Sequence, residues 1–263
     1  MAKKILVVDN HPVMLRMLAN LLVRHGHEVR TAEDGLAALD VLKSFVPDII
    51  FVDLVMPNIS GEKLCRIVRN MPHLQDVFLV IVSAVAVEEN LDFIALGADA
   101  CIAKGGADSM ARHVSRVIEL ASRMGEPGEV PPDIFGREEV ATRQISRELL
   151  SSRRHLEVIL DNIVEGILEI GRNRKIIFAN PAAVRLIGLS EEKLLGMPLD
   201  AVADGFFLEP EEERAGSSVG AAQYPARTEV SGRLSHRQVV FSLLPVEGAE
   251  GVSSIVIIRE CCP

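Results

Sequence analysis

The chain has 263 residues, of which 48% are hydrophobic and 25% charged, and its formal net charge is −9. This composition is that of an ordinary globular protein and excludes a disordered chain, while the length predicts about two domains. Because the net charge is negative, we expect no direct binding of nucleic acid. The sequence has neither a signal-peptide pattern nor an apolar run long enough to span a membrane, so we expect a cytoplasmic protein with reduced cysteines and no membrane insertion.

The first half of the chain alternates apolar runs with helical patterns. Largely β-branched runs at 4–8, 49–52 and 78–82, with a shorter one at 100–103, predict strands buried on both faces of a sheet. Helical patterns separate them, at roughly 12–25, 34–45, 60–70, 87–97 and 107–123. This alternation predicts an α/β fold with a doubly wound parallel sheet.

Polar residues follow each of these strands. Asp9 and Asn10 follow the first, Asp53 the second, Ser83 the third and Lys104 the last. Because open α/β sheets bind ligands outside the carboxyl ends of their strands, we expect these residues to share one edge. Asp53 is then a candidate phosphoryl acceptor or metal ligand. Taken alone, Asp53 is equally compatible with a helix cap or a turn residue.

Residues 3–123 resemble a response-regulator receiver domain of two-component signalling. The matching segments are Ile5-Leu6-Val7-Val8-Asp9, Ala32-Glu33-Asp34-Gly35, Pro47-Asp48-Ile49-Ile50, Asp53 with Met56-Pro57 and Gly61, Ser83-Ala84, Gly97-Ala98-Asp99-Ala100 and Lys104. The resemblance implies a five-stranded, flavodoxin-like receiver fold over residues 1–124. It also implies that a partner sensor histidine kinase or phosphotransfer protein phosphorylates Asp53.

The resemblance further assigns the residues around Asp53. Asp9, Asn10, Asp53 and the backbone carbonyl of Val55 would hold Mg²⁺, which prefers hard oxygen ligands. The Ser83 hydroxyl and the Lys104 ammonium would bind the phosphoryl oxygens.

Three positions depart from the family pattern. Asn10 stands where a second acidic residue is usual, so we expect weaker Mg²⁺ binding. Gly105 replaces the usual proline after the lysine, which predicts a less rigid loop. Cys101 occupies the switch position, where the family carries an aromatic residue, and a small side chain there predicts an altered readout. These departures keep open the alternative of a non-phosphorylated pseudo-receiver that serves as an interaction scaffold.

A linker and a connector helix follow the receiver. Gly and Pro residues mark the linker at 125–137, and a helical pattern resumes over 138–158. Two series of mostly apolar residues recur at heptad spacing, Thr142, Leu149, Leu156 and Ile163, and Ile145, Ser152 and Ile159. This pattern favours a dimeric coiled coil, so we expect a homodimer; the alternative is an amphipathic helix that packs on its own chain.

Residues 159–260 resemble a PAS domain, with a tail at 261–263. The segments that carry the resemblance are Ile159 to Ile170, Gly171-Arg172-Asn173-Arg174, Lys175 to Ala183 and Leu186 to Glu192 with Leu195-Gly196. An α+β fold with an antiparallel sheet follows, with strands at 166–170, 175–179, 227–230, 238–244 and 252–259 and a helix capped by Asn180 with Pro181 in its first turn. Residues 201–226 match poorly and predict a variable loop.

The PAS ligand is not assigned by the sequence, and the domain is compatible with having none. No histidine lies in 190–215, where a haem ligand would be expected by analogy, and no cysteine lies in the middle of the domain. PAS folds also serve for sensing or dimerisation, so fold alone does not identify a ligand.

These features together predict a phosphorelay response regulator. It would be a phosphoprotein rather than an enzyme, with no DNA-binding or catalytic output domain, because no helix-turn-helix or nucleotide-binding motif follows the PAS domain. The rival interpretation is the N-terminal sensory part of a hybrid histidine kinase or nucleotide cyclase.

Overall fold

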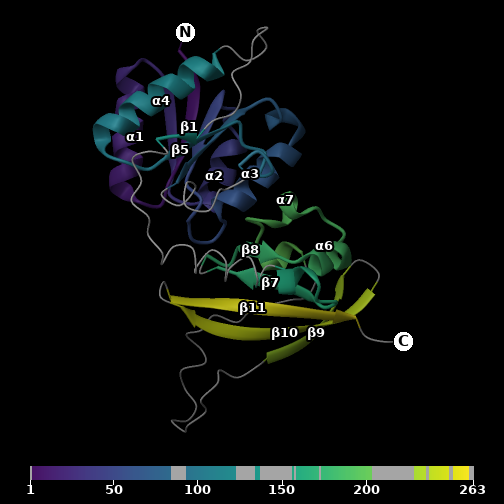
Figure 1. Cartoon of the computed structure of the whole chain (residues 1–263). Coiled ribbons are helices and arrows are strands. Elements are labelled where there is room, and N and C mark those ends of the chain that lie inside the picture. Colours follow the sequence, from purple (N-terminus) through teal and green to yellow (C-terminus); the bar gives the residue numbers. More distant parts are fainter. Residues whose placement is uncertain are drawn as a thin grey trace. The chain divides into compact units, whose positions relative to one another are not determined.

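Figure 1 shows a computed structural model of the chain, which divides into two compact units, residues 1–154 and 155–263. The structure describes residues 2–83, 93–122, 134–136, 156, 158–171, 173–202, 228–234, 237–248 and 251–260. Within these ranges no helix is long and apolar enough to cross a membrane.

The first unit is built on a parallel sheet with the strand order β2-β1-β3-β4-β5-β6. The strands are β1 (Lys4–Val8), β2 (Glu28–Ala32), β3 (Ile49–Val52), β4 (Phe78–Ser83), β5 (Ala100–Ala103) and β6 (Ile134–Phe135). The helices are α1 (Pro12–Arg24), α2 (Gly35–Leu42), α3 (Gly61–Asn70) and α4 (Ala107–Ala121), with a 3₁₀ turn, η1, at Pro72–Leu74. The predicted doubly wound parallel fold is confirmed.

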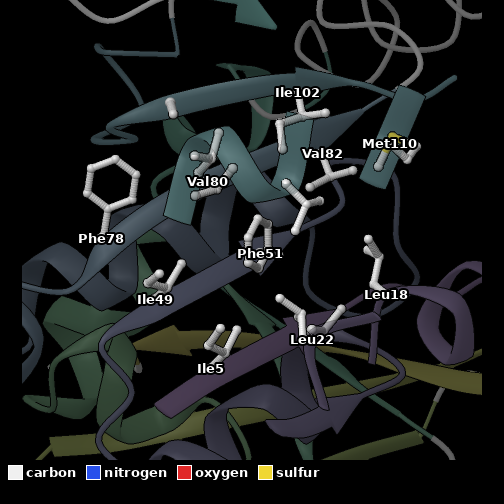
Figure 2. Packing of buried hydrophobic residues seen from close by; sticks show 14 of the residues in the cluster. Ile5, Leu18, Leu22, Ile49, Phe51, Phe78, Val80, Val82, Ile102 and Met110 are labelled. Carbon is white, nitrogen blue, oxygen red and sulfur yellow. The ribbon is translucent and has the colours of Figure 1, made fainter. Parts of the chain in front are cut away.

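Both faces of this sheet are buried. Figure 2 shows alternate strand residues, such as Phe51 and Ile102, packing with Leu18 and Leu22 of α1 and Met110 of α4 in one core. The intervening residues, such as Ile50, point to the opposite face and are also fully buried. A strand covered on both sides has no polar alternation, and this is why β1, β3 and β4 were recognisable as unbroken apolar runs.

The sheet has one strand more than the five predicted. Ile134 and Phe135, in the segment predicted as a linker, pair in parallel with Cys101 and Ile102 of β5. A strand of two residues between Pro-rich and Gly-containing stretches has no periodicity to reveal it, so contacts with the rest of the fold define it. The helix expected at 87–97 falls largely on residues outside the described ranges, while residues 93–97 form turns.

The second unit is an α+β domain with an antiparallel sheet, as predicted. The strand order is β8-β7-β11-β10-β9, with β7 (Gly166–Ile170), β8 (Ile176–Ala179), β9 (Thr228–Leu234), β10 (Arg237–Gly248) and β11 (Gly251–Glu260). The short helices α6 (Pro181–Ile187) and α7 (Glu191–Leu194) and the 3₁₀ turn η3 (Leu199–Ala201) follow β8. In Figure 1 this unit runs from green to yellow.

Asn180 joins three parts of the second unit. Its Oδ1 accepts hydrogen bonds from the backbone N–H groups of Ile167 and Ala183, each 2.8 Å long. Its Nδ2 donates to the carbonyls of Leu160 and Glu165 at 3.1 and 3.0 Å. The side chain is fully buried. The predicted helix cap is therefore confirmed. The same side chain also links α6 by hydrogen bonds to β7 and to the segment before β7.

Most of the predicted connector, residues 138–155 and 157, lies outside the described ranges, and so do the greater part of the variable loop and the tail. The end of the connector is helical at residues 156 and 158–161. There the heptad residues Leu156 and Ile159 are 57% and 48% exposed, so they are available for contact with another chain.

Candidate functional site

Three of the predicted residues meet at the carboxyl edge of the parallel sheet. Lys104 Nζ lies 2.8 Å from Asp9 Oδ2 and 2.9 Å from Asp53 Oδ2. Asp9 follows β1, Asp53 follows β3 and Lys104 follows β5, so three separate strand ends supply the cluster. The side chains of Asp9, Asp53 and Lys104 are only 1%, 8% and 17% exposed. The edge thus holds a buried carboxylate pair bridged by one cation.

Burial sets the protonation behaviour of Asp53. Loss of solvent raises the pKa of its carboxyl above the ordinary value, and the Lys104 ammonium opposes that rise. The neighbouring Asp9 carboxylate raises the pKa further, and the Val55 N–H lowers it by donating a hydrogen bond. The ionised form therefore depends on nearby cations, and a second cation at this edge would favour it.

The raised pKa of Asp53 predicts a pH-dependent stability difference from Asp53→Asn. The folded state holds the Asp53 proton more tightly than the unfolded state, so the wild type gains stability as pH falls toward the unfolded pKa and loses it as pH rises through the folded pKa. Asparagine does not titrate. Calorimetry in EDTA from pH 8 to 4 should therefore show the receiver transition of the wild type rising relative to that of Asp53→Asn. A constant difference would contradict the assignment.

Backbone groups fix both carboxylates. Asp9 Oδ1 accepts a 2.8 Å hydrogen bond from the His11 N–H at the start of α1. The Asp53 N–H donates to the Val8 carbonyl at 2.9 Å, which ties the end of β3 to the end of β1. Because these contacts use the main chain, the positions of Asp9 and Asp53 are set by the fold itself.

The loop after β3 is held closely against Asp53. A Cβ built on Gly61 would lie 2.0 Å from the Asp53 carbonyl oxygen, so only glycine fits there. Asn58 has a positive φ of 59°, and its Nδ2 donates to Asp34 Oδ2 at 2.5 Å. Asp34 Oδ1 also caps α2 by accepting from the Ala37 N–H.

Asn58 and Asp34 were not predicted as site-supporting residues. Met56 and Pro57 were recognised as part of the receiver resemblance, but the partner of the neighbouring Asn58 lies 24 residues away, and only the folded chain brings Asn58 and Asp34 together. Their contact fixes the loop that carries Val55.

The remaining predicted residues lie around this cluster. Ser83 ends β4 and is fully buried, and its carbonyl accepts from the Lys104 N–H at 3.0 Å. Val55 is exposed in the loop after β3, and Asn10 is exposed beside Asp9. The structure thus places these residues at one edge, while the roles assigned to them remain predictions.

Cys101 is fully buried in β5, where desolvation raises the pKa of its thiol to about 12. A small side chain cannot make a movement as large as that of an aromatic residue. Its assignment as the switch position remains a prediction.

The donor set fits a hard divalent cation. Asp9 Oδ2 is buried and accepts no well-aligned hydrogen bond from a described residue, although the Lys104 ammonium lies 2.8 Å away. Asp9 and Asp53 together offer two carboxylates, and Mg²⁺ in proteins is usually bound through one or two. Within the described ranges no three His, Cys, Asp or Glu side chains form a metal-binding group.

The family models match both units. The model of the response regulator receiver domain matches residues 5–114, and that of the PAS domain matches residues 154–221. The chain is 39% identical over 100 residues to the sensor histidine kinase RcsC of Salmonella typhimurium, a match that covers 38% of this chain and 10% of RcsC. It is 36% identical over 84 residues to the response regulator PleD of Caulobacter vibrioides, covering 32% of this chain and 18% of PleD.

Some solved structures are similar to parts of the chain. The chemotaxis response regulator CheY4 of Vibrio cholerae is 25% identical, with a TM-score of 0.42, over 44% of this chain and 99% of CheY4. The PAS domain of an HTR-like protein from Haloarcula marismortui is 17% identical, with a TM-score of 0.38, over 46% of this chain and all of that domain. Receiver and PAS domains are non-catalytic signalling modules. The chain carries a response regulator receiver domain followed by a PAS domain, a combination that points to two-component signalling.

Proposed function

We propose that the protein is a phosphorelay response regulator. In this proposal a partner histidine kinase or phosphotransfer protein phosphorylates Asp53, and the PAS domain serves in sensing or dimerisation. The observation that carries the proposal is the buried cluster of Asp9, Lys104 and Asp53 at the carboxyl edge of the sheet. A structural helix cap would not require two buried carboxylates to share one ammonium.

The cluster suits phosphoryl transfer, which depends on positioning and charge neutralisation. An Asp53 carboxylate oxygen forms the new bond to phosphorus, and the phosphorus–nitrogen bond of the donor phosphohistidine breaks. The imidazole nitrogen keeps that electron pair, and because the other ring nitrogen of the donor carries a proton, the histidine leaves as neutral imidazole. Lys104, already 2.9 Å from Asp53, supplies positive charge to the phosphoryl oxygens, and the Ser83 hydroxyl is assigned to donate to another.

Mg²⁺ belongs to this proposal as the second cation. Asp9, Asp53, the Asn10 amide oxygen and the Val55 carbonyl would hold it, and when bound it would neutralise charge on the phosphoryl oxygens. Asn10 supplies no negative charge, so the site should bind Mg²⁺ more weakly than one with a third carboxylate. The two buried carboxylates still retain a net negative charge after pairing with Lys104.

Beryllofluoride tests the proposed function directly, because it binds a receiver carboxylate as a phosphoryl mimic. Fluorine NMR of the full chain with beryllofluoride and Mg²⁺ should show a bound signal that is absent without Mg²⁺ and absent in Asp53→Asn. No bound signal at saturating Mg²⁺ would favour the pseudo-receiver scaffold instead.

The exposed heptad residues support dimerisation through the connector. Leu156→Glu with Ile159→Glu places charge on the predicted seam and should shift the full chain from dimer to monomer in light scattering. Val158→Glu is the matched control, because Val158 is 61% exposed on the same helix but lies outside both heptad series. Equal masses for the seam variant and the control would contradict a coiled-coil seam.

The match to RcsC supports a second candidate, in which these domains are part of a larger sensor kinase. The chain spans only a tenth of that relative. Reading the coding sequence beyond codon 263 decides this, because a kinase would require a catalytic domain on the same open reading frame.

A further inference from the structure

Three residues of the segment predicted as a linker, 134–136, are docked on the receiver. Ile134 and Phe135 form β6, which pairs in parallel with Cys101 and Ile102 at the outer edge of β5. Both side chains are buried, and Phe135 belongs to the receiver core. The edge of β5 is thereby covered by the chain itself, so its backbone groups are not open to pairing with another strand.

β6 also contacts α4. The Arg116 guanidinium lies 5.6 Å from the centre of the Phe135 ring, and the His113 ring lies 6.5 Å from it. Gly136 follows with a φ of +84°, and a Cβ there would lie 2.9 Å from His113 Cε1 and 3.5 Å from Ala103 Cβ. The docked segment therefore rests on two elements at once, β5 and α4.

The connection between β5 and α4 carries the site lysine. β5 ends at Ala103, α4 begins at Ala107, and Lys104, Gly105 and Gly106 lie between them. Lys104 reaches Asp9 and Asp53 through its ammonium group and the end of β4 through its N–H. Lys104 continues directly from Ala103, so a shift of Lys104 acts on the strand with which β6 pairs.

We propose that β6 is an internal docking strand whose attachment to β5 and α4 is coupled to the Lys104 cluster. The inference rests on the proposed function, since phosphorylation of Asp53 would move the Lys104 ammonium from the Asp53 carboxylate to the phosphoryl oxygens. Weakened docking would release Ile134 and Phe135 and uncover the edge of β5. The release of β6 would then report phosphorylation, a role for which the small, buried Cys101 is unsuited.

Hydrogen exchange at residues 134–136 of the full chain tests the coupling. The readout is the exchange rate there relative to that of β3, so that a general loss of stability does not imitate release. Phe135→Ala removes the ring anchor and should raise this ratio about tenfold or more. Lys104→Met removes the bridging ammonium and should also raise it, by about tenfold.

Lys43→Met is the matched control for the lysine variant. Lys43 pairs with Asp40 at 2.6 Å on the exposed surface of the receiver, away from the site. Lys43→Met should leave the exchange ratio of residues 134–136 to β3 unchanged. A ratio unchanged by Lys104→Met, while Phe135→Ala raises it, would overturn the coupling.

Beryllofluoride with Mg²⁺ provides the second arm of the experiment. A bound fluorine signal together with a raised ratio supports the coupling, and a bound signal with an unchanged ratio overturns it. Failure of beryllofluoride to bind contradicts the proposed function alone, and the Lys104→Met result then decides the coupling by itself.

Discussion

Gly61→Ala should destabilise the receiver by about 3 kcal/mol or more, because the added methyl has no space. A Cβ at this position would lie 2.0 Å from the Asp53 carbonyl oxygen and 2.8 Å from the Leu54 Cα. Both are backbone atoms at the junction of β3 and the following loop, so they cannot move aside as a flexible side chain would. The Gly61 N–H also donates to the Leu54 carbonyl at 3.1 Å, which holds the two segments together.

Hydrogen exchange in β3 measures this effect without interference from the second domain. Exchange there should accelerate about a hundredfold, whereas exchange in β11 should not change. Gly106→Ala is the control, because a Cβ at Gly106 meets nothing within 4 Å and its φ of −64° suits any residue. Equal, small effects of the two substitutions would show that the loop does not press on Asp53.

Asn180→Ala should destabilise the PAS domain by about 3 kcal/mol or more, because one fully buried side chain makes four hydrogen bonds. The substitution leaves the N–H groups of Ile167 and Ala183 and the carbonyls of Leu160 and Glu165 without these partners. It also removes the N-cap of α6, which alone is worth about 1 kcal/mol. The lost hydrogen bonds destabilise β7, α6 and the segment before β7 together.

Exchange in β11 reports this change, and exchange in β3 serves as the internal reference. Asn173→Ala is the matched control in the same domain, since Asn173 is exposed and its Oδ1 accepts from the Lys175 N–H at 3.2 Å. It should alter exchange in β11 by less than about fivefold. An Asn180→Ala variant that resembles this control would contradict the role given to the four hydrogen bonds.

The sequence was sufficient to predict both folds and the three charged residues that meet at the carboxyl edge of the receiver sheet. Unbroken apolar runs in β1, β3 and β4 follow from burial on both sides of a parallel sheet, and a polar residue after each strand marks the ligand-binding edge. Asp9, Asp53 and Lys104 were identified in this way, and the structure places the Lys104 ammonium 2.8 Å from Asp9 and 2.9 Å from Asp53.

Other features depend on contacts that periodicity does not encode. β6 is two residues long and owes its position to Arg116, His113 and the edge of β5. The Asn58–Asp34 hydrogen bond joins loops that are far apart in the chain. Asn180 was recognisable as a cap from Asn-Pro, but its two donor bonds become visible only when the backbone around it is folded.

Phosphorylation of the purified chain by acetyl phosphate in Mg²⁺, followed by intact mass, tests the central claim most directly. The account predicts a gain of one phosphoryl group in the wild type, none in Asp53→Asn and none when EDTA removes the metal. A gain that persists in Asp53→Asn would place the acceptor elsewhere. No gain in the wild type at high Mg²⁺ and long incubation would contradict a working receiver.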